Sequence, residues 1–467
     1  MVSPKPIMDF AAANQRQRAF FQSGATRSVT FRRAHLERLA GALGRHEAAL
    51  LSALQADLGK SLSQGYASEF GLVQMEIRHA LRNLRRWAAP KRCRTPWFVA
   101  PARGWVQSEP FGIVLILGPW NYPVQLLVSP LVSAIAAGNC AVLKPSELAP
   151  RTAKAITELI NDCFDEPYVT IVNGGADVAE ALLRQRFDKI FFTGSTRVGR
   201  LVMAAAAKHL TPVTLELGGK CPAIVCADAT VALAARRIAW GKFMNAGQTC
   251  VAPDFVLVAR EARDSFVTAM KKALHEFYGD DPAQCNDYGR IVNPVHFERL
   301  VHYLSEGKAI HGGRHDAKNL FITPTILAAV SPDAAVMQEE IFGPILPVLE
   351  FDTLDEALAL LRDRPTPLAL YVFTRDRATE GRVLANVRSG GACVNDVVSH
   401  MIGAELPFGG LGASGMGSYH GRAGFEAFSH QRAVLRRATW LDTSFRYPPE
   451  RLSLGGLKRA MRLLLGD

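Results

Sequence analysis

The segment FGIVLILGPWNYP, residues 111–123, joins a continuous apolar run to a turn that contains Gly, Pro and Asn. Four further apolar runs follow along the chain: CAVLKP at 140–145, YVTIVNG at 168–174, KIFFTG at 189–194 and VTLELG at 213–218. Helical patterns fill the intervals, at 124–137, 152–163, 178–185 and 198–209. This alternation predicts an α/β fold with a doubly wound parallel sheet. Parallel strands that are buried on both faces explain why the runs are continuously apolar.

A second set of strands and helices follows the first. Strand patterns occur at 255–259, 322–327, 345–351, 368–374 and 391–397, and helical patterns at 263–278, 295–306, 353–363 and 378–387. Upstream, residues 10–21, 29–43, 46–57 and 66–87 have the apolar spacing of helices. Prolines punctuate residues 88–109, which favours an exposed hairpin or an oligomerisation arm over a core strand. We therefore expect two α/β layers, a helical layer and a small arm.

The composition is that of a globular, intracellular chain. With 467 residues, 48% of them hydrophobic and 21% charged, the protein exceeds the size of a single core. Its eight cysteines are scattered without CxxC spacing, and its first residues lack the pattern of a secretory signal. We expect a cytoplasmic protein with free thiols and no metal site.

Positive charge is concentrated near both ends of the chain. The net charge of +11 comes from residues 1–110 and 430–467, and the middle is slightly acidic. Because no aromatic and basic residues are interleaved as in RNA-binding modules, we expect no nucleic-acid partner. Residues 451–467 have the pattern of a basic amphipathic helix, which can lie on an anionic membrane or cover a protein surface. The segment is too short to span a bilayer.

Polar residues follow three of the first five apolar runs. Gly194 to Gly199, GSTRVG, open a helix whose free amides can bind phosphate, although a plain strand–turn–helix junction explains this pattern equally well. Lys144 and Glu147 lie where ribose hydroxyls can be bound, or they are simply surface charges. Asn121 is an amide donor suited to an oxyanion hole, or a helix N-cap.

Cys250 lies in GQTCVA and Glu216 in ELGGK. A thiol nucleophile and a carboxylate that activates water supply both halves of covalent catalysis, because the first forms a thioester and the second hydrolyses it. Taken alone, Cys250 is more consistent with a buried structural thiol than with a nucleophile.

Six motifs in order, GPWNYP, LKPSE, FFTGST, LELGGK, GQTCVAPD and EEIFGP, resemble the motif set of the aldehyde dehydrogenase superfamily. The resemblance spans most of the chain. VNDV at 394–397, the glycine-rich residues 407–421 and RYPP at 446–449 are similar to the class 3 branch. The resemblance implies a Rossmann-type cofactor domain, a second α/β catalytic domain and a small bridging or oligomerisation arm.

The resemblance also implies roles for individual residues. Cys250 is the nucleophile, Asn121 the oxyanion donor and Glu216 the base for water, so that an aldehyde becomes a carboxylic acid while NAD or NADP is reduced. Glu340 holds the nicotinamide ribose and Phe342 packs beside the nicotinamide. The remaining expected dinucleotide contacts are Lys144, Glu147, Gly194, Ser195, Thr196 and Gly199.

The expected domains follow the same resemblance. The expected dinucleotide-binding domain consists of residues 1–87 and 110–215, with a return segment at 398–422. The expected catalytic domain consists of residues 216–397. The arm consists of residues 88–109 and 423–446, and the tail of residues 447–467. We expect a homodimer, with peripheral membrane contact through the tail as one option. Two alternative functions remain open: an acylating aldehyde dehydrogenase or fatty acyl reductase on the same fold, and a non-catalytic binding or membrane-surface protein. Apolar and aromatic residues such as Trp120, Tyr122 and Ile402 favour medium-chain or aromatic aldehydes.

Overall fold

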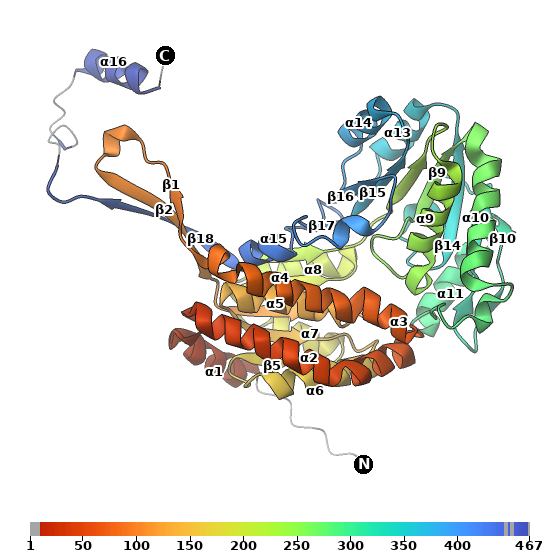
Figure 1. Cartoon of the computed structure of the whole chain (residues 1–467), viewed down its shortest axis with the longest axis horizontal. Coiled ribbons are helices and arrows are strands. Elements are labelled where there is room, and N and C mark those ends of the chain that lie inside the picture. Colours follow the sequence, from red (N-terminus) through yellow and green to blue (C-terminus); the bar gives the residue numbers. More distant parts are fainter. Residues whose placement is uncertain (1–9, 443–446, 449–452, 466–467) are drawn as a thin grey trace. The chain divides into compact units, whose positions relative to one another are not determined.

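The computed structural model describes residues 10–442, 447–448 and 453–465 (Figure 1). The chain divides into two compact units, one of Met1–Ala88 with Glu109–His430 and one of Ala89–Ser108 with Gln431–Asp467. The larger unit contains a six-stranded and a seven-stranded sheet.

The predicted first sheet is confirmed. Its strand order is β17-β7-β6-β3-β4-β5, and all neighbours run parallel except β17, which pairs antiparallel with β7. Every residue of β3 and β4 is buried, as the continuous apolar runs predict. The strands are β3 Ile113–Leu117, β4 Cys140–Lys144, β5 Val169–Ile171, β6 Lys189–Thr193, β7 Val213–Glu216 and β17 Gly415–Met416.

Helices cover both faces of this sheet. All residues of α5 are buried, because α4 and α2 form a further layer over it. A helix that is apolar on all sides needs such a cover. The helices of this half are α1 Phe10–Gln22, α2 Val29–Leu58, α3 Leu62–Gly65, α4 Gly71–Ala88, α5 Gln125–Ala137, α6 Pro150–Cys163, α7 Ala176–Leu183 and α8 Thr196–Ala207, with α15 Gly421–Ala427 against α5.

Two helix boundaries differ from the prediction. The helices expected at 29–43 and 46–57 form the single helix α2, because Gly44 between them is only a weak breaker and has open space around it. The helix expected at 66–87 begins with one π-helical turn, Tyr66–Phe70. This turn places Glu69 inside the protein.

The second sheet has the order β10-β13-β14-β9-β8-β15-β16. The interior strand β8, Pro222–Val225, was not predicted, because four residues that begin with proline give a weak strand pattern. The strand expected at 322–327 is divided into β12 Phe321–Ile322 and β13 Thr325–Ala328. The other strands of this sheet are β9 Phe255–Ala259, β10 Lys308–His311, β14 Ile345–Phe351, β15 Ala369–Phe373 and β16 Gly391–Val394.

Helices also lie on both faces of the second sheet. Helices α9 and α10 pack on each other, and α13 and α14 lie across the sheet from them (Figure 1). Right-handed crossovers in opposite directions along the sheet produce this arrangement. The helices are α9 Val231–Phe243, α10 Arg263–Tyr278, α11 Pro294–Tyr303, α12 Ala335–Gln338, α13 Leu354–Arg362 and α14 Arg377–Asn386.

The smaller unit contains most of a three-stranded antiparallel sheet with the order β1-β2-β18. Its strands are β1 Lys91–Cys93, β2 Ala102–Pro110 and β18 Ser429–Arg437. Helix α16, Leu454–Leu465, is amphipathic. Within the described residues, no helix combines the length and apolarity that crossing a bilayer requires.

Candidate active site

The candidate site lies where the connections of the first sheet diverge. Strand β3 leads through α5 to β4, whereas its neighbour β6 leads through α8 to β7 on the opposite side. The loops that follow β3 and β6 therefore separate, and such divergence opens a crevice at the carboxyl ends of parallel strands. A cavity of about 650 Å³ occupies this place. Its lining includes Trp120, Asn121, Gly194, Ser195, Glu216, Cys250, Glu340 and Phe342.

The backbone before Cys250 follows a left-handed turn. Asn245 and Ala246 both have φ of 52°, and Gly247 has φ of 74°. A Cβ atom at Gly247 would lie 2.2 Å from the backbone oxygen of Gly343, so only glycine fits. The turn brings Cys250 to the cavity with its side chain partly exposed. Burial, together with the charges of Glu340 and Glu216, raises the pKa of the Cys250 thiol.

Asn121 is held in place from several sides. Its Nδ2 atom donates to the backbone oxygen of Gln248 at 3.0 Å, and its own backbone oxygen accepts from Nζ of Lys60 at 2.9 Å and from Nδ2 of Asn245 at 3.0 Å. Lys60 also forms a fully buried ion pair of 2.6 Å with Glu69. Asn121 is thus fixed relative to the loop that contains Cys250.

Glu216 ends strand β7 and is 2% exposed. Among the described residues, neither carboxylate oxygen of Glu216 has a hydrogen-bond partner. Burial therefore raises the pKa of Glu216 well above its usual value. A buried carboxylate without partners is costly to a fold, so its position in the same cavity as Cys250 is a mark of a functional site.

Glu340 and Phe342 approach the cavity from the loop before β14. A Cβ atom at Gly218 would lie 1.9 Å from Oε2 of Glu340, so this glycine makes room for the carboxylate. Oε1 of Glu340 is buried without a hydrogen-bond partner among the described residues. Burial, then the charge of Asp254, raises the pKa of Glu340 to about 8. The Phe342 ring meets the Trp120 ring edge-on at 5.3 Å.

Some residues of the GSTRVG segment line the cavity of Cys250, and others support the turn before α8. Gly194 and Ser195 line the cavity, and the Ser195 hydroxyl caps α8 by accepting from the amide of Val198. Thr196 donates its hydroxyl to the backbone oxygen of Ala413 at 3.0 Å instead. Gly199 is buried, and a Cβ there would lie 2.7 Å from the Leu217 side chain. These last two residues hold the loop and the helix rather than line the cavity.

A neighbouring cavity of about 400 Å³ lies beyond the ends of β4 and β5, and Glu147 lines it. Nζ of Lys144 is 2.8 Å from Oε2 of Glu147 and 3.2 Å from the backbone oxygen of Pro145. Lys144 itself is buried, whereas Glu147 is exposed.

A third cavity, of about 340 Å³, is mainly apolar. Tyr122 and Ile402 line it, as expected from the sequence, whereas Trp120 faces the cavity of Cys250. Tyr122 is tied to the residue before Cys250, because its hydroxyl lies 2.7 Å from Oγ1 of Thr249. Further lining residues are Trp240, Met244, Phe277, Tyr278, Val398 and Met401.

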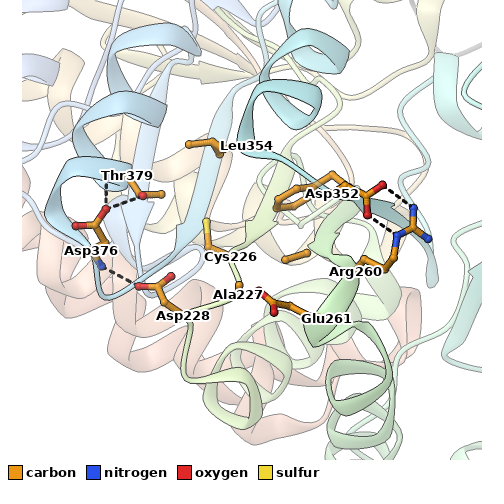
Figure 2. Close-up of a pocket in the computed structure, with 11 residues that line it drawn as sticks. Cys226, Ala227, Asp228, Arg260, Glu261, Asp352, Leu354, Asp376 and Thr379 are labelled. Carbon is orange, nitrogen blue, oxygen red and sulfur yellow. Dashed lines mark hydrogen bonds and ion pairs between the residues drawn. The ribbon is translucent and has the colours of Figure 1, made fainter.

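The second sheet carries a wider cavity of about 720 Å³ beyond its own strand ends (Figure 2). Three of the carboxylates that surround it, those of Asp228, Asp352 and Asp376, already have partners within the protein. Asp228 accepts from the amide of Asp376 at 2.9 Å, Asp376 caps α14, and Asp352 accepts from Arg260 at 3.0 Å (Figure 2). These three carboxylates therefore have a structural role in the fold. Cys250 lines the cavity at the first sheet and not this one.

Several residues of the site were not predicted. Lys60 and Glu69 come from the N-terminal helices, far from Asn121 in sequence, and no local pattern marks them. His296 and Arg299 line the cavity of Cys250 from α11. Arg299 donates to the backbone oxygens of Glu340 and Ile341 at 3.1 and 2.8 Å, which holds the loop of Glu340.

The site fits a dinucleotide. The N-terminus of α8 at Ser195 and the unpartnered Oε1 of Glu340 both lie at this cavity, and these are features that phosphate and ribose groups satisfy. Within the described residues, no group of three or more His, Cys, Asp or Glu side chains is arranged to hold a metal ion.

Comparison with known proteins agrees with this geometry. Residues 7–434 match the model of the aldehyde dehydrogenase family. A 4,4'-diaponeurosporen-aldehyde dehydrogenase of Staphylococcus aureus is 45% identical over 92% of this chain and 95% of that protein. A dimeric NADP-preferring aldehyde dehydrogenase of Canis lupus familiaris is 46% identical over 93% and 96%. A solved structure of Staphylococcus aureus AldH in a substrate-bound state has a TM-score of 0.95, with 42% identity, over 98% of this chain and 100% of that one.

The chain belongs to the aldehyde dehydrogenase family. It is an NAD(P)-dependent oxidoreductase that acts on aldehydes, and its relatives include members of aldehyde dehydrogenase family 3, as the class 3 resemblance implied.

Proposed function

We propose that the protein oxidises apolar aldehydes to carboxylic acids through a covalent thioester on Cys250 that water hydrolyses. The observation that carries this proposal is the meeting of Cys250, Asn121 and the unpartnered carboxylate of Glu216 in one cavity. When bound, a dinucleotide would supply the two-electron acceptor for the hydride that must leave the tetrahedral carbon before the thioester exists.

Cys250 adds its sulfur to the aldehyde carbon. The thiol must first lose its proton, because the thiolate is the nucleophile and burial raises the thiol pKa. Cys250 is partly exposed in the cavity, so this proton passes to solvent, and Glu216, whose oxygens have no other partner among the described residues, serves the later hydrolysis. Addition makes the carbon tetrahedral and places negative charge on the former carbonyl oxygen.

Asn121 and the backbone amide of Cys250 stabilise that oxygen. Fixed N–H donors favour a developing oxyanion because they need no reorganisation when the charge appears. Asn121 uses one of its amide protons on the backbone oxygen of Gln248, which leaves the other for the oxyanion. The contacts of Lys60 and Asn245 with the Asn121 backbone preset this geometry.

Glu216 then deprotonates the water that attacks the thioester. An acylating enzyme, which passes the acyl group to another thiol, has no need of a base for water. The absence of partners on Glu216 among the described residues therefore favours hydrolysis over acyl transfer.

We assign dinucleotide contacts to the residues around the cavity of Cys250 and the neighbouring cavity that Glu147 lines. Glu340 would hold the nicotinamide ribose and Phe342 would pack beside the nicotinamide. Gly194 and Ser195 would meet the pyrophosphate, while Thr196 and Gly199 support that turn from behind. Glu147, oriented by Lys144, would meet the adenosine ribose.

The apolar cavity is the proposed channel for the substrate chain, which supports medium-chain aliphatic or aromatic aldehydes. A relative that is named for a 4,4'-diaponeurosporen aldehyde also supports an apolar substrate.

The functional domains that we propose are 1–87 and 110–215 with 398–422 for the dinucleotide, and 216–397 for catalysis. Residues 88–109 and 423–446 would form an arm that joins two subunits, because β18 is an edge strand available for pairing and a relative is named dimeric. Residues 447–467 would form a tail that contacts a membrane surface peripherally.

The test is the formation of NADH from octanal or benzaldehyde in the absence of coenzyme A. We expect turnover by the unmodified protein and by Cys285→Ala, a control that removes another partly exposed thiol. Cys250→Ala should be inactive. Turnover that requires coenzyme A, or that survives Cys250→Ala, would overturn the proposal.

A further inference from the structure

A fourth cavity, of about 260 Å³, adjoins the apolar channel. Leu72, Met401 and Ile402 line both cavities, so the two cavities adjoin at these residues. The fourth cavity is bounded by α4, by α5 and by the segment from Met401 to His420. We call it the α4 cavity.

The lining of the α4 cavity carries more basic than acidic side chains. Arg78, His79 and Arg82 face it from two successive turns of α4. Glu76 is the one carboxylate in its lining, and it is occupied: Oε1 accepts from the amide of Gly421 at 2.8 Å, and Oε2 lies 3.7 Å from Nδ1 of His420. The exposed Glu405 lies 3.5 Å from His79 and leaves both arginines free to attract an anion.

Two buried polar side chains of the α4 cavity retain the capacity to donate hydrogen bonds. Gln125 is 1% exposed and His420 is 7% exposed, and both line the cavity. Nε2 of His420 has no hydrogen-bond partner among the described residues, and Gln125 has a side-chain hydrogen bond with Tyr419. The amide of Gln125 has a second proton to donate, and Nε2 of His420 is a donor in the tautomer that places the ring proton there. Buried donors normally have partners, so a ligand with acceptor oxygens is expected here.

The α4 cavity is also linked to the reacting centre. Gln125 precedes Leu126, which lines the cavity of Cys250, so the first turn of α5 separates the two spaces. Tyr122, from the same loop, lines the apolar channel. Under the proposed function, a substrate chain that follows the channel away from Cys250 meets the α4 cavity at Leu72, Met401 and Ile402.

We propose that the α4 cavity binds a carboxylate at the far end of the substrate, so that the enzyme prefers aldehydes that carry such a group. Arg78 and Arg82 attract the carboxylate and Gln125 donates a hydrogen bond to it. This inference rests on the proposed function, because it assumes that the aldehyde reacts at Cys250. Charge-assisted hydrogen bonds from arginine to carboxylate are strong enough to decide between otherwise equal chains.

The test compares two aldehydes of equal length, octanal and suberic semialdehyde, with the full chain and NAD or NADP at low ionic strength. The measured quantity is the ratio of kcat/KM for the semialdehyde to kcat/KM for octanal. We expect a ratio of about ten or more, which charge-assisted contacts can supply. In Arg78→Gln/Arg82→Gln the ratio should fall to about one.

Arg85→Gln/Arg86→Gln is the matched control, because it removes the same charge from the same helix outside the α4 cavity. It should keep the ratio of the unmodified protein. Gln125→Met should lower the ratio as well. If this buried substitution prevents folding, the arginine variants still test the inference, because both arginines are exposed and their replacement does not disturb the core.

Three results would overturn the inference. The first is a ratio of the two kcat/KM values near one in the unmodified protein, and the second is an equal ratio in the two arginine variants. The third is a ratio near one together with inhibition of octanal oxidation by suberate, where the Arg78→Gln/Arg82→Gln variant abolishes that inhibition. The third result would assign the cavity to a free carboxylate rather than to the substrate. Octanal turnover distinguishes these failures from failure of the proposed function, in which neither aldehyde is oxidised.

Discussion

Nζ of Lys60 lies 2.9 Å from the backbone oxygen of Asn121. The same ammonium group is paired with Glu69, whose second carboxylate oxygen accepts from the amides of Val124 and Gln125 at the start of α5. One buried ion pair therefore positions both the proposed oxyanion donor and the helix that follows it.

We predict that Lys60→Met destabilises the protein and lowers kcat. The substitution leaves Glu69 buried without its partner, which costs about 3–5 kcal/mol. The freed Asn121 loop should lower kcat by about a hundredfold, because small misplacements of catalytic groups have effects of this size. Thermal unfolding and steady-state kinetics measure the two effects. Lys60→Met/Glu69→Gln removes the unpaired charge and should regain stability without regaining kcat; a double variant with full kcat would show that Asn121 does not depend on Lys60.

Gly218→Ala should abolish dinucleotide binding. The added methyl group would occupy the place of the Glu340 carboxylate, since the new Cβ would lie 1.9 Å from Oε2. Fluorescence titration with NADH measures the change in Kd, and we expect a rise of about a hundredfold or more, equal to about 2.7 kcal/mol. Gly44→Ala in α2 has open space and serves as the control. An unchanged Kd in Gly218→Ala would remove Glu340 from the cofactor site.

Stability should depend on the protonation of Glu340. Its folded-state pKa of about 8 lies above the unfolded value near 4.5, so the folded state binds the proton more tightly. The contribution of Glu340 to the free energy of unfolding is fully present below its unfolded-state pKa. This contribution is lost as the pH rises through the folded-state pKa of about 8. Glu340→Gln should therefore gain stability relative to the unmodified protein as the pH rises from about 4.5 to about 8, by about 1.4 kcal/mol for each pH unit in that window. Denaturant unfolding at several pH values, without dinucleotide, measures this difference; a difference that stays constant with pH contradicts the assignment.

The tail should bind anionic vesicles. Helix α16 exposes Leu457, Met461 and Leu463 together with the basic residues Lys458, Arg459 and Arg462. Such a helix inserts its apolar face at the interface while its charges contact acidic lipids. The full chain should pellet with anionic vesicles at low salt, and a chain that ends before Arg451 should remain in the supernatant. Equal recovery of both chains in the supernatant would exclude membrane contact through the tail.

The sequence predicted the first sheet well because each of its buried strands is one continuous apolar run between helices. β3 at 113–117 and β6 at 189–193 lie within the predicted runs. β8 was missed because a four-residue strand in the interior of a sheet gives little pattern of its own. Helix α2 was divided in the prediction because Gly44 was given more weight than the packing that overrides it.

The candidate site was predictable only in part. Cys250, Asn121 and Glu216 were proposed from ordered motifs, and their shared cavity is a property of the fold that no single motif contains. The pair of Lys60 and Glu69 was not predictable, because its meaning depends on contacts with Asn121 and α5 that are distant in sequence. The left-handed backbone at Asn245 and Ala246 likewise has no sequence pattern that marks it.

The most direct test of the central claim is a search for the acyl-enzyme. Glu216→Gln, mixed with octanal and NAD, should accumulate an octanoyl group on Cys250, which intact-protein mass spectrometry detects as a stable adduct. NADH should appear in a single burst, with a steady rate at least about a hundredfold below that of the unmodified protein, because the base for water is lost. An unchanged steady rate with no adduct would contradict the role of Glu216 and the thioester route through Cys250.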